Sequence, residues 1–451
     1  MDTCHESARD IPVAASVDVI VCGGGPAGVS AAIAAGRAGA SVLLIEVHGC
    51  LGGVWTAGQL AWLFEMERPG FARELAERLT ARGACFRSAD RFGQPGQSCP
   101  GFAYDVELMK ELLEDLCRES GVRVLLHTRV VAAEVSEEGG RRRITGVVTE
   151  NCGGRQAWRA PCVVDASGNG DCAALAGCDF AIGRDNAGSS QPLTLMGLMT
   201  CDDPEALRPM VSFWRGDLTW SLRKAAVEGL RAALTVGGIT PSYGSPTIFH
   251  VHDRVFALMI NHEYGVSAID GQQISDATIR ARSELQRAVR ALRAQGGPFA
   301  GLVLVASAEH IGIRDGRRIV GRYVVTVDDL ITGRRHADAV CRCSFNIDIH
   351  HTDPQRGTVI ERDHPTVHAY DIPYRALLPR DVDGLLLAGR CISGDFQAHA
   401  SYRVTGIATT LGQVAGIAAA LAVQRGVLPH ELPFSALEPL VPAVDGALLA
   451  R

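Results

Sequence analysis

Residues 17–46 read VDVIVCGGGPAGVSAAIAAGRAGASVLLIE. An apolar strand over 17–22 leads into a G-x-G-x-x-G turn at Gly23, Gly25 and Gly28. Glycines at this spacing permit a tight bend, a close approach of the backbone to a pyrophosphate, and close packing of the next helix on the strand. The N-terminus of that helix then points at the phosphates.

The second half of this stretch completes the pattern. An alanine-rich helix ends near Ala38, and Gly39 follows where a C-cap glycine is typical. The next strand, 41–45, ends at Glu46, which can accept hydrogen bonds from a ribose hydroxyl. In this order the features predict an adenine-dinucleotide site, and they leave open whether the ligand is NAD or FAD.

Composition and charge are those of a soluble globular protein. The chain has 451 residues, 47% hydrophobic and 21% charged, which suits about two to three domain-sized units. A net charge of −6 gives no reason to expect nucleic acid or an anionic membrane as a partner. No basic segment followed by an apolar one begins the chain, so we expect a cytoplasmic protein with a disordered leader at 1–16.

Two features have alternative interpretations. Residues 404–423 are apolar enough for a membrane span, but their glycines, threonines and Gln413 favour a buried helix against a sheet.

The 14 cysteines are scattered without a C-x-x-C pair. We interpret Cys341 and Cys343 as strand alternation, the thiols as reduced, and the chain as having no metal site.

The middle of the first half predicts helices and a small meander. Helical periodicity covers 69–83 and 105–120, the latter with Asp105 as N-cap. Short β-like runs follow around 122–135, 143–150 and 156–166, separated by glycine-rich turns. This pattern is typical of an antiparallel meander inserted in an α/β domain.

The character of the chain then changes. Residues 185–375 contain more aromatics, histidines and prolines and no further βαβ unit, and a helix is expected at 275–294. The α/β pattern resumes at 384–390 with a buried strand and a glycine turn. We therefore expect a discontinuous first domain and a mixed α+β second domain.

Two later motifs bear on the ligand. VVDASGNGD at 163–171 is a strand entering a glycine turn, and LLLAGR at 385–390 is another. Gly168, Gly170 and Ala173 also fit G-x-G-x-x-A, but no strand with a terminal acid follows, so a second nucleotide site is disfavoured.

With the opening βαβ unit and these two later turns, the chain resembles two-domain flavoproteins of the glutathione-reductase type. More narrowly, it resembles the FAD-dependent oxidoreductase family, distant relatives of the fumarate reductase and succinate dehydrogenase flavoproteins. The stretches that carry the resemblance are the first βαβ unit, LGGVWTAG (51–58), VVDASGNGD, QPLTLMG (191–197), HIGIRDGRRIVGRYVVTVDDL (310–330), NIDIH (346–350), YDIPYRALLPRDVDGLLLAGR (370–390) and SYRVTGIATTLGQVAGIAAA (401–420).

The resemblance implies FAD, with its ring system between the domains. The expected fold is α/β, with a three-layer Rossmann-like FAD-binding domain at 17–184 and 376–430, a mixed α+β substrate domain at 185–375, and a C-terminal tail at 431–451. The residues that it implies for the cofactor are Gly23, Gly25, Pro26, Ala27, Gly28, Glu46, Gly52, Gly53, Thr56, Val130, Ala166, Ser167, Gly168, Asp171, Gly389, Arg390, Thr405 and Gly406.

The attachment of the cofactor is a separate question. A flavin disulfide reductase would place a cysteine pair soon after Glu46, but Cys50 is followed next by Cys85. This spacing argues against disulfide chemistry. Some relatives tether FAD through a histidine or cysteine near this loop, so a covalent link through His48 or Cys50 stays open, and non-covalent FAD is favoured.

Candidate catalytic residues lie in two segments. With strand alternation, Asn346, Asp348 and His350 of NIDIH would share one face, with His350 as proton acceptor. His399 and Arg403, at alternate positions before the small-residue helix, are the second pair. The dipole of that helix and Arg403 would stabilise reduced flavin.

A cluster of three arginines can be either structural or ligand-binding. We expect two of Arg314, Arg317 and Arg318 to be salt-bridged, and Arg314 is left open as a clamp for a carboxylate or the flavin.

The sequence thus predicts a flavoenzyme that dehydrogenates a small organic substrate, with hydride passing to FAD and a histidine accepting a proton. Alternatives are reduction of an activated double bond, a monooxygenase using NAD(P)H and oxygen, and a non-catalytic protein of the same fold. The substrate, the electron acceptor (oxygen or another carrier) and the oligomeric state are not determined by the sequence.

Overall fold

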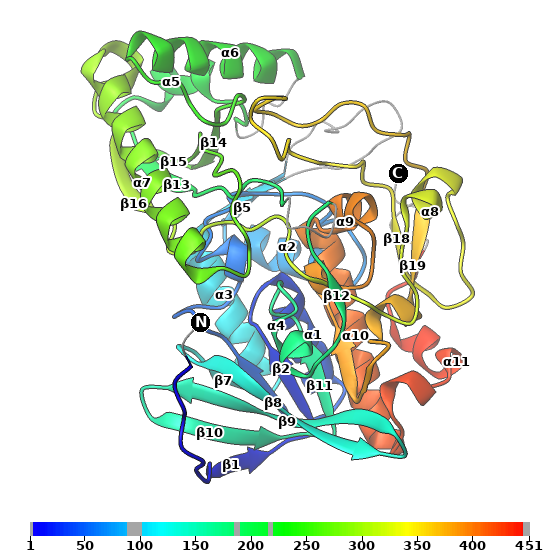
Figure 1. Ribbon diagram of the computed structural model, residues 1–451. Helices are drawn as coiled ribbons and strands as arrows, with labels where there is room; N and C mark the ends of the chain where they lie inside the picture. The colour runs from blue at the N-terminus through cyan, green and yellow to red at the C-terminus, as the bar shows by residue number, and fades with distance from the viewer. Residues whose placement is uncertain (1–2, 88–101, 185–189, 215–219, 445–451) are drawn as a thin grey trace.

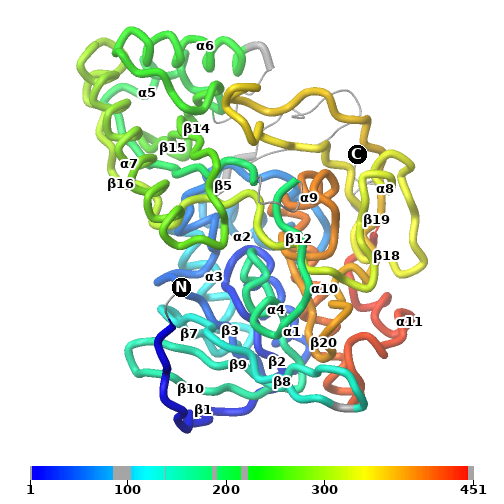
Figure 2. The backbone as a smooth tube through the Cα atoms, in the orientation of Figure 1, coloured from blue at the N-terminus to red at the C-terminus, as the bar shows by residue number. Residues whose placement is uncertain are grey.

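The computed structural model describes residues 3–87, 102–184, 190–214 and 220–444. Two hydrophobic cores lie side by side in it. In the view of Figures 1 and 2 the smaller core lies above the larger one.

A five-stranded parallel sheet forms the centre of the larger core. Its strand order is β21-β11-β2-β3-β7, and Val19 pairs with Val42 where the two halves of the opening motif meet. Four of the strands are fully buried, as expected of a parallel sheet covered on both faces, and the edge strand β7 is partly exposed. They span Val19–Cys22 (β2), Val42–Ile45 (β3), Val122–Leu125 (β7), Cys162–Asp165 (β11) and Leu385–Leu387 (β21).

Two small-residue helices pack against each other beside this sheet, α1 (Pro26–Arg37) and α10 (Thr405–Arg425). A Cβ atom on Gly412 would lie 2.0 Å from the Ala27 carbonyl oxygen, so glycine is needed for this approach. Helix α10 is long and apolar enough to cross a membrane, but 78% of its most apolar window is buried in the fold. The expected buried helix is therefore what the structure contains.

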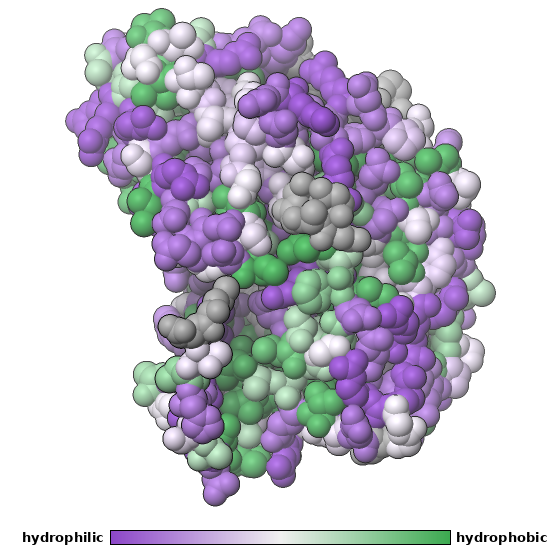
Figure 3. Space-filling view, viewed as in Figure 1, coloured by the Kyte–Doolittle hydropathy of each residue, from purple (hydrophilic) through white to green (hydrophobic). Residues whose placement is uncertain are grey.

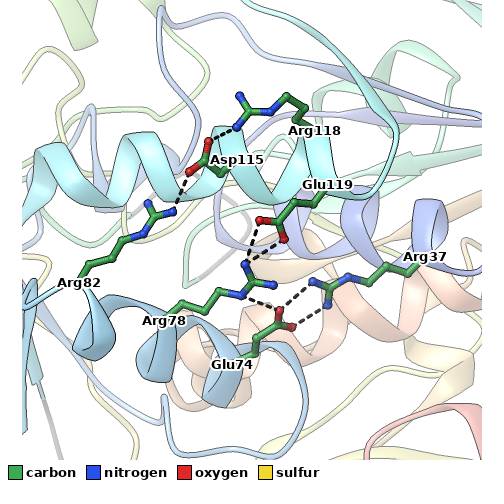
Figure 4. Close-up of polar contacts among 7 residues, drawn as sticks. All are labelled: Arg37, Glu74, Arg78, Arg82, Asp115, Arg118 and Glu119. Atoms are coloured by element: carbon green, nitrogen blue, oxygen red, sulfur yellow. Dashed lines mark hydrogen bonds and ion pairs between the residues drawn. The ribbon is translucent and has the colours of Figure 1, made fainter.

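Helix α3 (Val106–Glu119) packs against α1, and helix α2 (Phe71–Ala81) packs against α3 and α10. Both lie close to their predicted ranges. The Asp105 side chain accepts hydrogen bonds from the amides of Glu107 and Leu108, as an N-cap does. Ion pairs connect the three helices, as Figure 4 shows. The participants are Arg37 on α1, Glu74 and Arg78 on α2, Arg82 at its end, and Asp115, Arg118 and Glu119 on α3.

The predicted meander forms a second sheet at the bottom of Figure 1. Strand β1 (Val13–Ser16) adds to it in parallel with β10. The expected disordered leader is therefore wrong for residues 13–16, because their backbone groups complete the edge of this sheet. The other strands are β8 (Arg129–Glu138), β9 (Arg141–Asn151), β10 (Gly154–Arg159) and β20 (Val382–Asp383).

The smaller core is built on an antiparallel sheet in the order β14-β15-β13-β16. Helix α7 (Gly271–Ala294) covers it and confirms the helix predicted at 275–294. The other elements are β13 (Gly197–Thr200), β14 (Thr247–His252), β15 (Val255–Met259), β16 (Val303–Ser307), α5 (Pro204–Leu207) and α6 (Trp220–Val236).

The two cores do not divide the chain at the expected boundaries. Buried residues from Leu193 to Ile313, together with Ala61, Trp62 and Ala103, form the smaller core. Buried residues from Ile319 to Tyr374 belong to the larger one. The expected tail contributes too, since Leu432 and Leu437 are buried in the larger core. Apolar side chains from 319–374 and from the tail thus belong to the same core as the parallel sheet, which the change in composition at 185 and 375 did not indicate.

The remaining elements are short. They are α4 (Asp171–Leu175), α8 (Val327–Thr332), α9 (Phe396–Tyr402), α11 (Phe434–Leu437), β4 (Trp62–Leu63), β5 (Cys85–Arg87), β6 (Phe102–Tyr104), β12 (Phe180–Ala181), β17 (Arg318–Ile319), β18 (Ala339–Cys343), β19 (Tyr370–Pro373) and seven 3₁₀ turns among the described residues.

Candidate functional site

A cavity of about 1640 Å³ lies between the two cores and is lined by both. It is larger than the roughly 300–1000 Å³ usual for one small ligand, so it has room for a dinucleotide and a substrate. Cys22, Glu46, Ala166 and Ala388, at the carboxyl ends of β2, β3, β11 and β21, all line it. Ligands bind at this edge in open α/β sheets. On the face shown in Figure 3, apolar residues gather along the indentation between the two parts.

The opening glycine turn forms one end of the cavity. Gly23 has φ +100°, and a Cβ there would lie 2.6 Å from the Ala166 carbonyl oxygen. At Gly25 a Cβ would meet nothing within 4 Å, so the backbone is open to a ligand. Helix α1 begins here with no side-chain cap and no acid in its first turn. Its first amides are thus available for a pyrophosphate.

Glu46 lies beside this turn and is 4% exposed. One carboxylate oxygen accepts from the Gly24 amide at 2.6 Å and the other from the His48 amide at 2.9 Å. These bonds hold the carboxylate at the cavity wall, where it can receive ribose hydroxyls.

Most of the residues that the sequence assigned to the cofactor line this one cavity. They come from segments up to about 380 positions apart, which the parallel sheet brings together. They are Gly23, Gly25, Pro26, Ala27, Glu46, Gly53, Val130, Ala166, Ser167, Gly168, Asp171, Gly389, Arg390 and Thr405.

Gly28, Gly52, Thr56 and Gly406 do not line the cavity but lie behind its wall. A Cβ on Gly28 would lie 1.7 Å from the Gly23 oxygen, and one on Gly406 would lie 2.3 Å from the Glu65 oxygen. The Gly52 amide donates to the Gly24 oxygen at 2.7 Å, and the Thr56 hydroxyl donates to the Leu51 oxygen. These residues shape the wall through close packing and backbone contacts.

The two candidates for a covalent link differ in position. His48 lines the cavity, with Nδ1 3.5 Å from a carboxylate oxygen of Glu309. Cys50 is buried outside the lining, its Sγ 3.6 Å from the Thr56 hydroxyl oxygen, and burial raises the pKa of its thiol. A buried, protonated thiol is a poor nucleophile.

A second helix N-terminus meets the cavity at α10. Val404 and Thr405 line the cavity, and the helix begins without a side-chain cap or an acid in its first turn. Arg390 lies close by and donates to the Ile313 oxygen at 2.5 Å. Burial lowers the pKa of Arg390 to about 10. The helix end is placed to supply the positive field that the sequence analysis expects here, and the Arg390 guanidinium adds a positive charge.

The NIDIH pattern predicts a strand, but residues 344–349, which precede His350, have irregular structure. The preceding strand, β18, already ends at Cys343. The predicted alternation still holds. Asn346, Asp348 and His350 line the cavity, whereas the isoleucines between them are buried away from it.

Arg403 holds this segment in place. Its Nη2 donates to the Asp348 backbone oxygen at 2.7 Å and to the carboxylate at 3.1 Å. The Asp348 carboxylate lies 3.9 Å from His350 Nε2. Three of the four predicted catalytic residues are therefore neighbours.

His399 is the fourth, and it is 0% exposed and does not line the cavity. The sequence analysis places His399 and Arg403 at alternate positions of an extended segment. This placement is wrong because residues 396–402 form helix α9. In a helix His399 and Arg403 are one turn apart, and the Arg403 amide donates to the His399 oxygen at 3.0 Å. His399 packs beneath the site, with its ring centroid 5.5 Å from that of Tyr402.

The structure adds residues that the sequence did not indicate. His350 Nδ1 lies 3.1 Å from His262 Nε2, and His262 Nδ1 lies 3.1 Å from the Tyr264 hydroxyl. The Tyr243 ring packs against His262 in a tilted arrangement, with its ring centroid 4.2 Å from that of His262. Burial lowers the pKa of His262 to about 2 and that of His350 well below its ordinary value. Both rings are thus neutral near pH 7.

The three arginines of the 314–318 cluster divide as expected. Arg318 pairs with buried Asp315 at 3.1 Å, and Arg317 pairs with Asp171 at 2.7 Å. Arg314, which was left open, lines the cavity and donates to the Pro192 oxygen at 2.6 Å and to the Thr194 hydroxyl at 2.8 Å. Within the described ranges no group of three histidines, cysteines or acids is placed to hold a metal ion.

A family model described as FAD dependent oxidoreductase matches residues 18–441. The chain belongs to that family. FAD is therefore its cofactor, in agreement with the glycine turn, Glu46 and the two open helix ends around the cavity. No curated protein sequence matches this flavoprotein significantly.

Solved structures similar to this flavoprotein have low sequence identity. A geranylgeranyl bacteriochlorophyll reductase-like protein from Thermoplasma acidophilum is 15% identical over 94% of this chain and 83% of its own, with a TM-score of 0.48. A p-nitrophenol 4-monooxygenase from Pseudomonas putida DLL-E4 is 12% identical over 94% and 84%, also with 0.48. A myxobacterial chondrochloren halogenase is 16% identical over 94% and 78%, with 0.47.

Proposed function

We propose that this flavoprotein dehydrogenates a small organic substrate and that His350 accepts the proton released. The substrate class is a compound with a hydroxyl group, or with an acidic C–H bond next to a carbonyl. When bound, FAD supplies the hydride acceptor. The residues that line the cavity from Gly23 to Thr405 hold it, without a covalent bond.

The hydrogen-bond chain behind His350 carries this proposal. The Tyr264 hydroxyl donates to the Ser242 oxygen at 3.5 Å, so it is left to accept from His262 Nδ1. His262 Nε2 then accepts from His350 Nδ1. This arrangement leaves the lone pair of His350 on Nε2, where a substrate proton can be taken.

Asp348 supports the same role. Its carboxylate, 3.9 Å from His350 Nε2, stabilises the ring as the ring gains a proton. Arg403 fixes Asp348 through two hydrogen bonds from Nη2, one to the backbone oxygen and one to the carboxylate. Asp348 and Arg403 thus orient and balance the charge of the proton acceptor.

The test is anaerobic loss of flavin absorbance when the holoenzyme is mixed with a panel of hydroxy and carbonyl compounds. We expect His350→Gln to slow this bleaching by about 10²–10⁴-fold for any substrate that bleaches the wild type. His351→Gln is the matched control, because its side chain lies outside the cavity lining. An unchanged rate in His350→Gln, or rapid NAD(P)H oxidation in air as a monooxygenase shows, would contradict the proposal.

A further inference from the structure

Two cysteines on β18 lie in contact in the larger core. Cys341 and Cys343 are two positions apart on this strand, where alternation places both side chains on the same face. Their Sγ atoms are 3.8 Å apart, and the side chains are 2% and 0% exposed. The two sulfurs are therefore close enough for rotation of the side chains to bring them to the roughly 2 Å of a disulfide bond.

A buried arginine distinguishes the two sulfurs. Arg68 Nη1 donates to Cys341 Sγ at 3.5 Å, and Nη2 donates to the Arg342 oxygen at 2.8 Å. The hydrogen bond from Cys343 and the charge of Arg68 lower the pKa of the Cys341 thiol. Burial raises the pKa of the Cys343 thiol, as it does that of Cys162. Because the thiolate is the reactive form of cysteine, Cys341 is the nucleophile of the pair.

A second, much smaller cavity reaches Cys341. Its volume is about 10 Å³, and its lining includes Arg68, Cys341, Arg342 and the segment 442–444. This is roughly the space that one water molecule needs. Hydrogen peroxide, which is little larger than water, can therefore reach the sulfur with a small shift of this segment.

The pair is connected to the cofactor cavity through Arg68. Arg68 Nη2 lies 2.8 Å from a carboxylate oxygen of Glu65, and Glu65 lines the cofactor cavity. The backbone of Glu65 has φ +63°, a conformation that is unfavourable for residues other than glycine. Ser344, which directly follows Cys343, lines the same cavity. A change at the two sulfurs therefore acts on two parts of the cavity wall.

We propose that Cys341 and Cys343 form a peroxide-sensitive redox pair that regulates the binding of FAD. The Cys341 thiolate attacks one oxygen of hydrogen peroxide, the O–O bond breaks, and the leaving hydroxide takes a proton from solvent to become water. The Cys343 thiol then attacks the resulting sulfenic acid, and a disulfide forms with release of a second water. The two sulfurs lose two electrons in total, and the peroxide accepts them. A dithiol reverses the reaction readily, because a disulfide that closes a single intervening residue is strained.

Peptide mapping tests the modification. Trypsin cleaves after Arg335, Arg342 and Arg356, so a disulfide between the two cysteines joins peptide 336–342 to peptide 343–356. We expect this linked pair after the FAD-loaded protein is treated with hydrogen peroxide, and its loss after dithiothreitol. Thiols that persist at 341 and 343, or oxidation there no faster than at buried Cys162, would overturn the proposal. This measurement uses the wild-type protein and so does not depend on the folding of a variant.

Two variants distinguish a redox pair from two structural cysteines. In Cys343→Ala we expect oxidation to stop at the sulfenic acid of Cys341, which dimedone labels. In Cys341→Ala we expect Cys343 to react at least about tenfold more slowly, because its sulfur stays a thiol. Cys201→Ala, a buried position of the smaller core, is the matched control and should form the disulfide at the wild-type rate. Equal reactivity of the remaining cysteine in the first two variants would contradict the assigned roles.

Release of FAD tests the regulation. When the FAD-loaded protein is diluted, flavin fluorescence rises as FAD dissociates. We expect the oxidised protein to bind FAD about tenfold more weakly than the reduced protein, because Arg68 and Glu65 rearrange beside an uncharged disulfide. Dithiothreitol should restore the affinity, and peroxide should leave it unchanged in Cys341→Ala. Equal FAD affinity of the two forms, with the disulfide confirmed by mapping, would overturn the regulatory role.

Discussion

His350 and His351 are adjacent in the chain but differ in their surroundings. His350 is 5% exposed and hydrogen-bonded to His262, whereas the His351 side chain is 22% exposed near Glu361. The direction of each side chain, not the residue type, makes one of them a candidate base. Because burial keeps the His350 ring neutral, its lone pair persists below the pH at which an exposed histidine gains a proton.

His262 should act through His350 as a positioning residue. We expect His262→Phe to lower the rate of bleaching by about 10–100-fold with little effect on substrate affinity, because His350 Nδ1 loses its acceptor. His262→Gln, whose amide oxygen can accept the same bond, should restore part of the rate. Rapid-mixing bleaching over a range of substrate concentrations separates rate from affinity, and equal loss in both variants would count against the role.

Glu46 should decide how tightly FAD binds. In Glu46→Gln one acceptor oxygen becomes a donor, so bonds to the Gly24 amide and to ribose hydroxyls compete for fewer acceptors. We expect FAD to bind about tenfold more weakly, as judged by quenching of flavin fluorescence during reconstitution. Glu77→Gln, exposed on α2, is the control, and equal affinity in the two variants would refute the assignment.

His48 and Cys50 bear on attachment of the cofactor. Cys50 lies outside the cavity lining, which leaves His48 as the residue within reach. We expect FAD to be released when the yellow protein is precipitated with acid, so that colour stays in the supernatant. Colour in the pellet would show a covalent bond, and its loss in His48→Ala would locate it.

At the scale of elements, the contact between α1 and α10 organises the cofactor site. Both helices present their N-termini to the cavity, and glycines on α10 let the two backbones approach. A methyl group on Gly412 would meet the Ala27 carbonyl oxygen at 2.0 Å, and one on Gly416 would meet that of Ala31 at 2.1 Å. These contacts are with backbone, which cannot move without shifting a helix.

Gly412→Ala should therefore destabilise the folded protein. We expect a loss of about 1–3 kcal/mol in the free energy of unfolding from overpacking, seen as a lower Tm and weaker FAD retention. Gly271→Ala is the matched substitution for the measurement of Tm, because a Cβ there meets nothing within 4 Å. If both variants unfold at the same temperature, the close approach is not what makes glycine necessary at 412.

At the scale of the whole molecule, buried histidines make stability depend on pH. Burial lowers the pKa of His262, His350 and His399, so the folded state binds fewer protons than the unfolded state below the ordinary pKa of about 6.5. Stability contributed by these neutral rings is thus complete above about pH 7 and is lost as pH falls.

At about pH 5.5 each such histidine should lower the free energy of unfolding by about 1.4 kcal/mol. Urea unfolding at several pH values measures this dependence. His399→Gln removes one titrating group. The slope of the free energy of unfolding against pH should therefore correspond to the uptake of about one proton fewer on unfolding. An unchanged slope would mean that His399 does not titrate on unfolding.

The opening βαβ unit could be predicted from sequence because its determinants are local. The turn at Gly23–Gly28, the cap at Gly39 and the acid at Glu46 depend on spacing within 30 residues, and strands β2 and β3 and helix α1 form where the pattern placed them. Period-two alternation likewise placed Asn346, Asp348 and His350 at one cavity, although the segment is not a strand.

The tertiary structure alone decided which distant residues meet. His262 is 88 positions from His350, and its neighbours Asn261 and Glu263 carry no motif that marks it as a partner. Arg223 and Arg314, far apart in the chain, likewise line the same cavity, because α6 and the segment after β16 border it. The spacing of residues along the chain indicates where turns and helix caps form and which side chains share a face. Contacts between separate elements depend instead on how the two cores pack together. The sequence thus determined the cofactor, and the packing of the second core on the first determined which side chains lie beside the cofactor site.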